Sequence, residues 1–537
     1  MKQHTLIALG LAIALGGATA RAQDDRGFEI AKNLEIFSSV YKQLNYNYVD
    51  DVDPGKTIKV AIDAMLSSLD PYTNYYPESQ MEDVKLQLLG EYGGIGSLIV
   101  QRGDSVYISE PYEGLPAAEA GLMAGDRIVA VDGQSTQGKT TSDVSAAMRG
   151  QAGTTVDLRI ERNGKLIDRT LTRRAIKLPN VPYFGMVEGN CGYIKLDEFT
   201  TDAAKHVREA LVELKRTHPD MKGLLLDLRG NGGGLMNEAV DIVGLFVPRG
   251  TLVVETKGKV ANKNTKNYTR QQPEDTQLPL AVIIDGGSAS ASEIVSGALQ
   301  DLDRATIVGQ RSFGKGLVQN ILPMPYNSQM KVTVSKYYIP SGRCIQAIDY
   351  SHRDEQGRAL KVPDSLKTAF HTASGRTVYD GFGIEPDVEV QPEYMSNLAI
   401  ALTQQFLIFD YATRYRRQHD HIAPASTFEV SDEMYADFCQ FLKERHLTYP
   451  TMTERVADQL REVAREEKYD SAIAPQLEAI AAAMQREKES DLQKHRPEVC
   501  DMLKAELLTR YYYDRGRIEG ALKTDPVVKR AVQEISK

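Results

Sequence analysis

The sequence predicts an α/β core that follows a small β-rich domain, with a helical region at each end of the chain. After Pro179, in a core assigned to residues 176–395, short apolar strands alternate with helical segments. Residues 89–175 are instead rich in glycine and short β-like runs. Residues 23–88 and 396–537 carry apolar residues at helical spacing. A chain of 537 residues, 42% of them hydrophobic, is long enough for several such domains.

The first 22 residues have the pattern of a secretory signal peptide. Lys2 and His4 precede the apolar run Leu6–Leu15, and small residues lead to an expected cleavage after Ala20 or Ala22. The apolar run is shorter than the roughly 20 residues that span a bilayer. We therefore expect an exported, soluble mature protein. An uncleaved segment that ties the protein to a membrane remains the alternative.

Charge and cysteine usage exclude some classes of partner and cofactor. The formal net charge is −9, from 64 basic and 73 acidic residues, which argues against a nucleic-acid partner. The cysteines are far apart and lack metal-ligand spacing, so they predict no metal site; we also expect no cofactor. The disulfide pairing stays open, because the sequence does not choose a pair. The four cysteines are Cys191, Cys344, Cys439 and Cys500.

The N-terminal region is predicted to be helical up to a turn. Ile30, Leu34 and Phe37 follow helical spacing. A proline disfavours helical geometry in the residue before it, so Asp70-Pro71 is expected to end a helix.

Within residues 89–175, the segment Pro116–Gly133 resembles a PDZ domain through its Ala-Gly-Leu and Gly-Asp-Arg-Ile pattern. PDZ domains bind a chain terminus by strand addition at a sheet edge, beside a turn whose amides hold the carboxylate. Gly94, Ile95 and Gly96, just before a predicted strand, would supply that turn. Taken alone, these glycines fit an ordinary hairpin turn better, so the longer pattern decides the interpretation.

In the core, the nearly continuous apolar strand Leu224–Arg229 runs into the glycine-rich turn Gly230–Gly234 and then into a helix. Backbone amides at such a turn can bind a developing oxyanion. Glycine by itself is weak support, since strand-to-helix turns use glycine for geometric reasons. The other elements expected in the core are Gly192–Leu196, Ala203–Arg216, Asn237–Val247, Leu280–Ile284 and Ser292–Leu299.

A turn of small residues carries Ser288, Ser290 and Ser292, and a lone lysine between two glycines, Lys315, follows. A serine hydroxyl attacks a carbonyl only when a base removes its proton, and a neutral amine can be that base. None of the nine histidines is an obvious partner. The sequence therefore suggests a serine nucleophile with a lysine base, although spacing alone gives the three serines similar weight.

A lysine that acts as a base needs a lowered pKa. The pKa has to fall from about 10.4 towards roughly 7 to 8, and burial among apolar groups can lower it. Phe313, Leu317 and Val318 are the candidate apolar neighbours of Lys315.

Five segments together resemble the carboxy-terminal processing proteases, also called tail-specific proteases. The resemblance covers roughly residues 30 to 395 and implies a crotonase-like α/β protease core with a PDZ domain inserted before it. The segments are Gly192–Ile194, Asp227–Gly234, Ser288–Ile294, Gly314–Gly316 and Tyr337–Arg343.

The resemblance also implies the roles of individual residues. The middle serine of Ser-Ala-Ser-Ala-Ser is the nucleophile in this family, which assigns Ser290, and the lysine of Gly-Lys-Gly is the base, which assigns Lys315. Gln319 matches the glutamine that orients this lysine. The backbone amides of Gly233 and of Ala291, just after the nucleophile, are the candidate oxyanion donors.

Other polar residues near these motifs are expected to have structural roles. Ser288 and Ser292 would cap or pack the helix that follows. Asp301 and Asp303 are not taken as a third catalytic member, because a carboxylate beside the lysine would raise its pKa. We expect these aspartates to be solvated or paired with Arg304.

Three regions depart from the family pattern or lie outside it. Asn231-Gly232 stands where the family often has Asn-Pro, and the extra glycine would make the turn more mobile before substrate binds. The segment Cys344–Gly381 is long for a strand connection and would edge the cleft. In residues 396–537 no chemistry stands out, so helical packing is expected there rather than a docking role.

The sequence thus suggests a serine endopeptidase of the carboxy-terminal-processing type that engages the C-termini of proteins or peptides through its PDZ domain. The family's usual compartment and the signal pattern indicate the periplasm. A homodimer and an adaptor protein stay open as partners. Two alternative functions also stay open: a PDZ-containing binding or scaffold protein with an inactive core, and a crotonase-type acyl-CoA enzyme.

Overall fold

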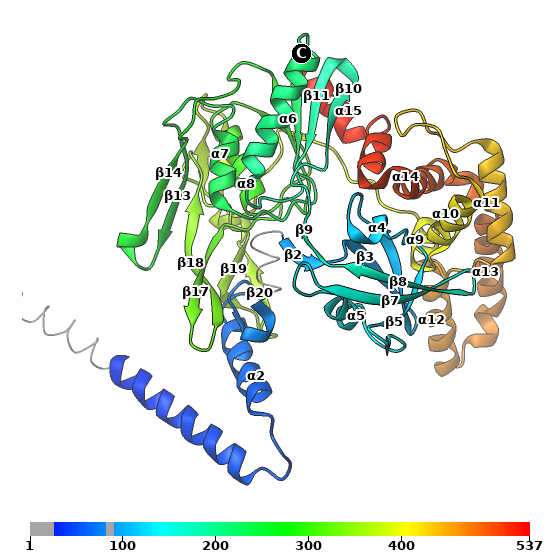
Figure 1. Cartoon of the computed structure of the whole chain (residues 1–537), viewed down its shortest axis with the longest axis horizontal. Helices are drawn as coiled ribbons and strands as arrows, with labels where there is room; N and C mark the ends of the chain where they lie inside the picture. Colours follow the sequence, from blue (N-terminus) through cyan, green and yellow to red (C-terminus); the bar gives the residue numbers. More distant parts are fainter. Residues whose placement is uncertain (1–25, 82–90) are drawn as a thin grey trace, which may run out of the picture. The chain divides into compact units, whose positions relative to one another are not determined.

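The computed structural model describes residues 26–81 and 91–537 (Figure 1). The predicted signal peptide, residues 1–22, lies outside the described residues. The chain divides into two compact units, residues 1–75 with 321–332, and residues 76–320 with 333–537.

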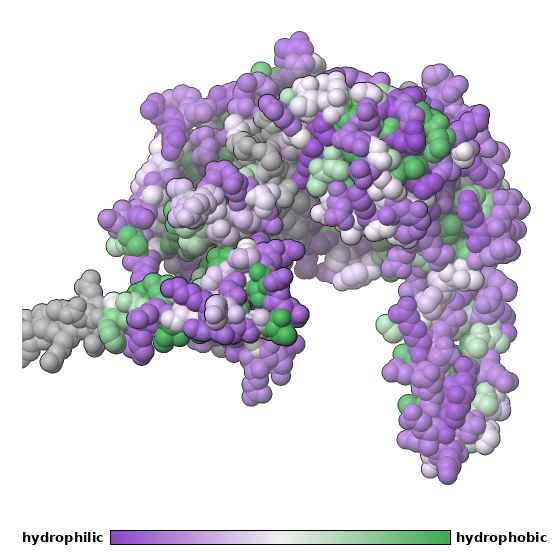
Figure 2. Space-filling model, turned by 60° about the horizontal axis from the view of Figure 1, so that its bottom comes forward, coloured by the Kyte–Doolittle hydropathy of each residue, from purple (hydrophilic) through white to green (hydrophobic). Residues whose placement is uncertain are grey.

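The N-terminal residues of the first unit are helical up to Ser67, as their apolar spacing predicted. One helix covers residues 26–47, and α2 (Pro54–Ser67) begins with the Asp53 carboxylate accepting from the Lys56 N–H, which satisfies a free donor at the helix start. The turn expected at Asp70-Pro71 precedes the short strand β1 (Asn74–Tyr76). Apolar side chains that remain exposed in this unit include Phe28, Leu34, Val40, Val60 and Met65. In Figure 2 hydrophobic residues appear as separate patches on a mostly hydrophilic face.

Residues 97–172 of the second unit form an antiparallel sheet of six strands, five of which lie side by side in one row. Its order is β3-β4-β5-β7-β8, so that β3 is a terminal strand of this sheet, and α5 (Thr141–Met148) contacts β3. Alternating side chains of the strands fill one apolar core. The strands are β3 (Ser97–Arg102), β4 (Ser105–Pro111), β5 (Arg127–Val131), β7 (Thr155–Arg162) and β8 (Lys165–Thr172); β6 (Gln134–Ser135) pairs with β5, and the short helix α4 is Pro116–Glu119. A separate pair joins β2 (Glu91–Gly94) to β9 (Arg174–Lys177).

The α/β core is built on a six-strand sheet of order β10-β11-β12-β15-β16-β23. Four neighbouring pairs, from β11 to β23, are parallel, and β10 is antiparallel to β11. The predicted alternation of strands and helices is therefore confirmed. The strands are β10 (Tyr183–Val187), β11 (Cys191–Lys195), β12 (Gly223–Asp227), β15 (Leu280–Ile284), β16 (Thr306–Gly309) and β23 (Val388–Glu389).

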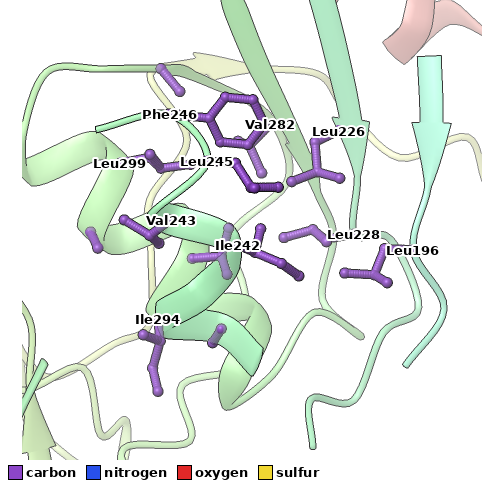
Figure 3. Close-up of a cluster of buried hydrophobic side chains, with 14 of the residues drawn as sticks. Leu196, Leu226, Leu228, Ile242, Val243, Leu245, Phe246, Val282, Ile294 and Leu299 are labelled. Carbon is purple, nitrogen blue, oxygen red and sulfur yellow. The ribbon is translucent and has the colours of Figure 1, made fainter. Parts of the chain in front are cut away.

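One face of this sheet packs against three helices, α6 (Ala203–Thr217), α7 (Met236–Val243) and α8 (Ala291–Asp301). Figure 3 shows Leu226 and Val282 of the sheet in the same apolar cluster as Val243 of α7. Because side chains alternate along a strand, Leu225 and Ile283 point to the other face. Burial on both faces explains why these strands are continuously apolar.

The other face is covered by the last helix of the chain. α15 (Pro526–Ile535) contacts β12, β15 and β16, and its Val528 and Ala531 are buried with Leu225 and Ile283. The C-terminal end of the sequence therefore completes the core, which the sequence analysis did not anticipate.

A second sheet supports the core through β13 (Leu252–Gly258), which pairs with β14 (Thr265–Tyr268) and with β18 (Ser328–Tyr338); β17 (Leu317–Met324) pairs with β18. The segment Cys344–Gly381 forms two small hairpins. They are β19 (Ile348–Arg353) with β20 (Ala359–Lys361), and β21 (Ala369–His371) with β22 (Thr377–Tyr379).

The remaining C-terminal residues are helical, as predicted. Aromatic and aliphatic residues of α9, α10, α11 and α14 share one apolar cluster. The helices are α9 (Asn397–Gln404), α10 (Leu407–Gln418), α11 (Asp432–Glu444), α12 (Met452–Glu466), α13 (Asp470–Lys494) and α14 (Arg496–Ala521). Among the residues that the structure describes, no helix has both the length and the apolar character needed to cross a membrane.

Candidate active site

Ser290 lies on the turn between β15 and α8 with a strained backbone. Its φ of 56° and ψ of −111° place a residue with a Cβ in a region that such residues rarely adopt. Conformations of this kind cost about 1–3 kcal/mol and persist only where surrounding contacts impose them. The turn therefore presents Ser290 at a cost in stability, and Ser290 is partly exposed.

The neighbouring serines are buried and have structural partners. The Ser288 hydroxyl donates to the Leu228 carbonyl at 2.8 Å, and the Ser292 hydroxyl donates to the Asn231 carbonyl at 2.8 Å. Both side chains are fully buried. They join the Ser290 turn to the glycine-rich turn after β12, which is a packing role like the one expected from the sequence.

Glu293, one turn into α8, links Ser290 to the lysine loop. Its Oε2 accepts from the Ser290 N–H at 2.8 Å and from the Lys315 N–H at 2.9 Å. Its Oε1 accepts from the Gly314 N–H at 2.7 Å and from the Ser312 hydroxyl at 2.5 Å. One carboxylate oxygen thus holds the backbones of both residues assigned to the Ser-Lys pair.

Burial governs the ionisation of Glu293. The side chain is fully buried, and this loss of solvation raises its pKa to about 7 although hydrogen bonds from Ser312, Lys315, Ser290 and Gly314 act in the opposite direction. All four donors are hydroxyl or backbone N–H groups, so none brings a full positive charge.

Tyr337 provides a second link between the two loops. Its hydroxyl lies 3.1 Å from the Ser290 carbonyl oxygen and 2.5 Å from the Lys315 carbonyl oxygen. A single hydroxyl proton can be donated to one of these oxygens at a time. The ring is buried on β18, so the hydroxyl is held in place by the core.

The Lys315 loop rests on the segment that follows β18. The Gly316 N–H donates to the Gln346 side chain at 2.7 Å, and the Ala347 N–H donates to the Gly314 carbonyl at 2.9 Å. A Cβ on Gly314 would lie 2.4 Å from that of Ala347, so this close approach requires glycine. Cys344–Gly381 therefore supports the lysine loop as well as forming hairpins.

The apolar neighbours expected around Lys315 differ in burial. Leu317 is 8% exposed and Val318 packs against the core, whereas Phe313 is 48% exposed and is the least buried of the three. Lys315 itself is partly buried. Gln319 lies on β17, and its amide donates to the Thr333 hydroxyl at 3.2 Å.

Gly233 approaches the Ser290 turn closely. A Cβ on Gly233 would lie 2.7 Å from the Ser290 Cβ and 2.9 Å from the Ala291 nitrogen, and its φ is +101°. Gly233 therefore packs directly against the backbone of the Ser290 turn. The Gly233 N–H donates to the Asn231 side chain at 2.9 Å, so an oxyanion has to share or replace this bond.

A charged network lies just before the glycine-rich turn. Asp227 is fully buried, accepts from the Tyr193 hydroxyl at 2.7 Å and pairs with the Arg229 guanidinium at 2.5 Å. Burial tends to raise the pKa of Asp227, but Arg229 outweighs it and the pKa is lowered. The Lys195 amine donates to the Arg229 carbonyl at 2.6 Å. Both the side chain and the carbonyl of Arg229 are therefore fixed.

The turn expected to hold a peptide carboxylate precedes β3. Gly96 has a φ of +72°, Ile95 is buried, and the Ile95 carbonyl accepts from the Ala117 N–H at 2.8 Å. Gly94 closes the pair of β2 with β9. The turn thus leads directly into the terminal strand of its sheet.

Comparison with known proteins matches three segments to families. Residues 190–352 match "Peptidase family S41", residues 107–162 match "PDZ domain", and residues 398–535 match "Probable PDZ-protease, C-terminal helical domain". A carboxy-terminal-processing protease of Bartonella bacilliformis is 38% identical over 321 residues, which cover 59% of this chain and 73% of that protein.

The chain belongs to peptidase family S41.

A probable CtpA-like serine protease of Staphylococcus aureus is 32% identical to this S41 peptidase over 383 residues, or 70% of this chain and 69% of that one. Among solved structures, the photosystem II D1 C-terminal processing protease is 27% identical and covers 67% of this chain and 93% of its own, with a TM-score of 0.37. The peptide-bound PDZ domain of a Vibrio cholerae carboxy-terminal protease is 28% identical, covering 16% of this chain and 99% of its own, with a TM-score of 0.16. Because both scores are low, family membership rests on the sequence matches.

In this S41 peptidase the expected pairing of two aspartates with Arg304 is wrong. Asp301 is buried and pairs with Arg343 at 2.8 Å, and Asp303 pairs with Arg376 at 2.7 Å. Arg304 instead donates to backbone carbonyls, including that of Phe246. Arg304 was expected as the partner because it is adjacent in sequence. The arginines that pair with the two aspartates instead lie about 40 and 70 residues further along the chain, and the fold brings them into contact.

Sequence reasoning gave no role to Glu293, Tyr337 or Asp227. A signal existed for Glu293, because Ser290 and Glu293 have the Ser-x-x-Glu spacing of a capping box at a helix start. Tyr337 and Asp227 lay inside recognised motifs, but only the fold shows which atoms they contact.

Proposed function

We propose that this S41 peptidase is an exported serine endopeptidase that takes up protein C-termini through its PDZ domain and cleaves with Ser290 and Lys315. The proposal is supported most by Glu293 Oε2, which accepts from the backbone N–H groups of both residues. A carboxylate that holds two loops together at a strained serine is expected where a nucleophile and its base must stay in register.

In the proposed reaction, the Ser290 hydroxyl oxygen bonds to the carbonyl carbon of the scissile peptide while the neutral Lys315 amine takes the hydroxyl proton. The N–H groups of Gly233 and Ala291 stabilise the oxyanion of the tetrahedral intermediate. Lys315 then gives its proton to the leaving amine, and an ester on Ser290 remains. Water, with Lys315 as base, hydrolyses the ester and restores both side chains. Gln319 orients Lys315.

Recognition is assigned to the β-rich domain. The edge strand β3 and the turn Gly94–Ile95–Gly96 have the arrangement that strand addition and carboxylate binding require. The proposed binding edge lies near α5, which contacts β3. An extended peptide paired with β3 would place its terminal carboxylate at the turn.

Two further parts of the proposal concern the core and the compartment. We take the core to be crotonase-like, in line with the parallel strands and the helices α6, α7 and α8 on one sheet face. The signal pattern of the first 22 residues supports export to the periplasm.

Cleavage of an unfolded protein with a free or an amidated C-terminus tests the proposal. Mass spectrometry of the products should show cuts by the wild type, loss of cleavage in Ser290→Ala and Lys315→Ala, and slower cleavage of the amidated substrate. Lys336→Ala, which removes an exposed lysine of β18, is the matched control and should cleave normally. Full activity in either active-site variant would contradict the assignment.

The two alternatives predict different results in the same assay. A scaffold protein with an inactive core would bind the peptide through its PDZ domain but give no product with the wild type. An acyl-CoA enzyme would turn over an acyl-CoA thioester and leave the protein substrate intact. Membership of a peptidase family favours neither alternative.

A further inference from the structure

We propose that Asp525, the residue before the last helix, is a positioning residue for the glycine-rich turn and acts through Arg229. Arg229 immediately precedes Gly230–Gly234, the turn that carries the Gly233 amide. The inference rests on the proposed function, because it assigns that amide to the oxyanion.

The Asp525 carboxylate makes two kinds of contact at once. Its Oδ1 accepts from the N–H groups of Val527 and Val528 at 2.9 and 3.0 Å, which caps α15. Its Oδ2 lies 2.8 Å from the Arg229 Nη2. The start of α15 is therefore joined to the residue that leads into the turn.

The ion pair between Asp525 and Arg229 is partly buried next to the glycine-rich turn. The Arg229 side chain is 24% exposed and that of Asp525 is 16% exposed, so solvent screens the pair less than it would a surface bridge. Burial acts to lower the pKa of Arg229, but Asp227 and then Asp525 outweigh it and raise the pKa. The guanidinium stays charged and is held between two carboxylates from different parts of the chain.

Packing makes this contact depend on the docking of α15. The apolar residues of α15 lie against the sheet face that carries Leu225, two residues before Asp227. When α15 is docked, Asp525 reaches Arg229, and the Arg229 carbonyl stays on the Lys195 amine. The C-terminal helix thus helps to fix the start of the oxyanion turn from the face opposite to α8.

Asp525→Asn is the informative variant. Asparagine caps a helix about as well as aspartate, so α15 keeps its cap while Arg229 loses the second negative charge. Because an oxyanion contact acts in the transition state, kcat for the unfolded protein with a free C-terminus should fall about 10-fold while KM stays within about 2-fold. Asp525→Ser, a second uncharged cap, should behave in the same way.

Glu534→Gln is the matched control, because it also removes one negative charge from α15. Glu534 pairs with Arg530 and Lys537. The kcat of Glu534→Gln should stay at the wild-type value. In an Arg229→Met background, Asp525→Asn should add no further loss, as a double-mutant cycle requires when one residue acts through the other.

Several results would overturn the proposal. They are a wild-type kcat in Asp525→Asn, an equal fall in Glu534→Gln, a change confined to KM, and an undiminished effect of Asp525→Asn in the Arg229→Met background. Loss of folded protein in both Asp525 variants would assign the residue a purely structural role and contradict it as well. A wild type that cleaves no substrate would instead contradict the proposed function.

Discussion

Glu293 and Asp227 are both fully buried carboxylates beside the candidate active site, yet they are stabilised in opposite ways. Glu293 accepts hydrogen bonds from neutral groups only, and burial raises its pKa to about 7. Asp227 faces the Arg229 guanidinium at 2.5 Å, and its pKa is lowered despite burial.

The difference separates two tasks. A carboxylate held by backbone N–H groups fixes the path of the chain, and Glu293 fixes the loops of Ser290 and Lys315 in this way. A carboxylate paired with arginine fixes a charge, and Asp227 anchors Arg229 at the entrance to the glycine-rich turn. The first arrangement is sensitive to pH near neutrality, whereas the second is not.

The largest effect is expected at the arginine-paired carboxylate. Arg229→Met removes the cation closest to buried Asp227 and leaves the Lys195 amine, 3.9 Å away, which should lower the stability of the sheet by about 3–5 kcal/mol. Hydrogen exchange of the β12 amides measures this opening free energy. The control Arg216→Met removes an exposed partner of Glu213 and should change the opening free energy far less. Equal effects of the two substitutions would remove the contrast.

At the carboxylate without a cation, Glu293→Gln should lower kcat at least about 10²-fold, equivalent to about 2.7 kcal/mol. Glutamine replaces one acceptor oxygen by an NH2 group that faces N–H donors, so the two loops lose part of their link. Glu238→Gln, at a buried carboxylate that accepts from the Ala204 N–H, is the control and should retain activity. Retention of full activity in Glu293→Gln would contradict the role given to this residue.

The two carboxylates should also respond differently to pH. Between the ordinary value of 4.5 and the folded value of about 7, folded Glu293 keeps a proton that the unfolded chain releases, so its contribution to stability falls as the pH rises. The stability of the wild type minus that of Glu293→Gln should therefore decrease by about 2 kcal/mol from pH 5 to pH 7. Asp227, with a lowered pKa, contributes stability that is lost only as the pH falls below its ordinary 3.8. Hydrogen exchange of the α8 amides, corrected for intrinsic rates, measures this stability difference between the wild type and Glu293→Gln. A difference that stays constant or rises from pH 5 to pH 7 would contradict the prediction.

The smallest effect is expected at Tyr337, which supplements the link made by Glu293. Tyr337→Phe removes the hydroxyl near the Ser290 and Lys315 carbonyls and should lower kcat about 10-fold, or about 1.4 kcal/mol. Tyr338→Phe changes the next residue of β18 and is the matched control. An equal loss in both variants would show a general effect on the strand.

Sequence patterns predicted the parts of this fold that local periodicity encodes. The fully buried strand β12 and the glycine turn after it were read from Leu224–Gly234, because a strand buried on both faces is continuously apolar. The position of α15 could not be read in this way, since its apolar stripe specifies burial but not the sheet face that covers it.

The candidate site was predicted in the same partial manner. Ser290, Lys315 and Gly233 were assigned through short motifs, and the fold brings their backbones together. The partners of Asp301 and Asp303 were missed, because Arg343 and Arg376 are distant in sequence and no local pattern marks them.

Covalent trapping of the acyl-enzyme tests the central claim most directly. The structure leaves Ser290 partly exposed, while Ser288 and Ser292 are buried with their hydroxyls bound to backbone carbonyls. Incubation with a serine-acylating peptide ester, followed by tandem mass spectrometry, should place the adduct on Ser290 and find none in Ser290→Ala or Lys315→Ala. An adduct on Ser288 or Ser292, or undiminished labelling of Lys315→Ala, would contradict the account.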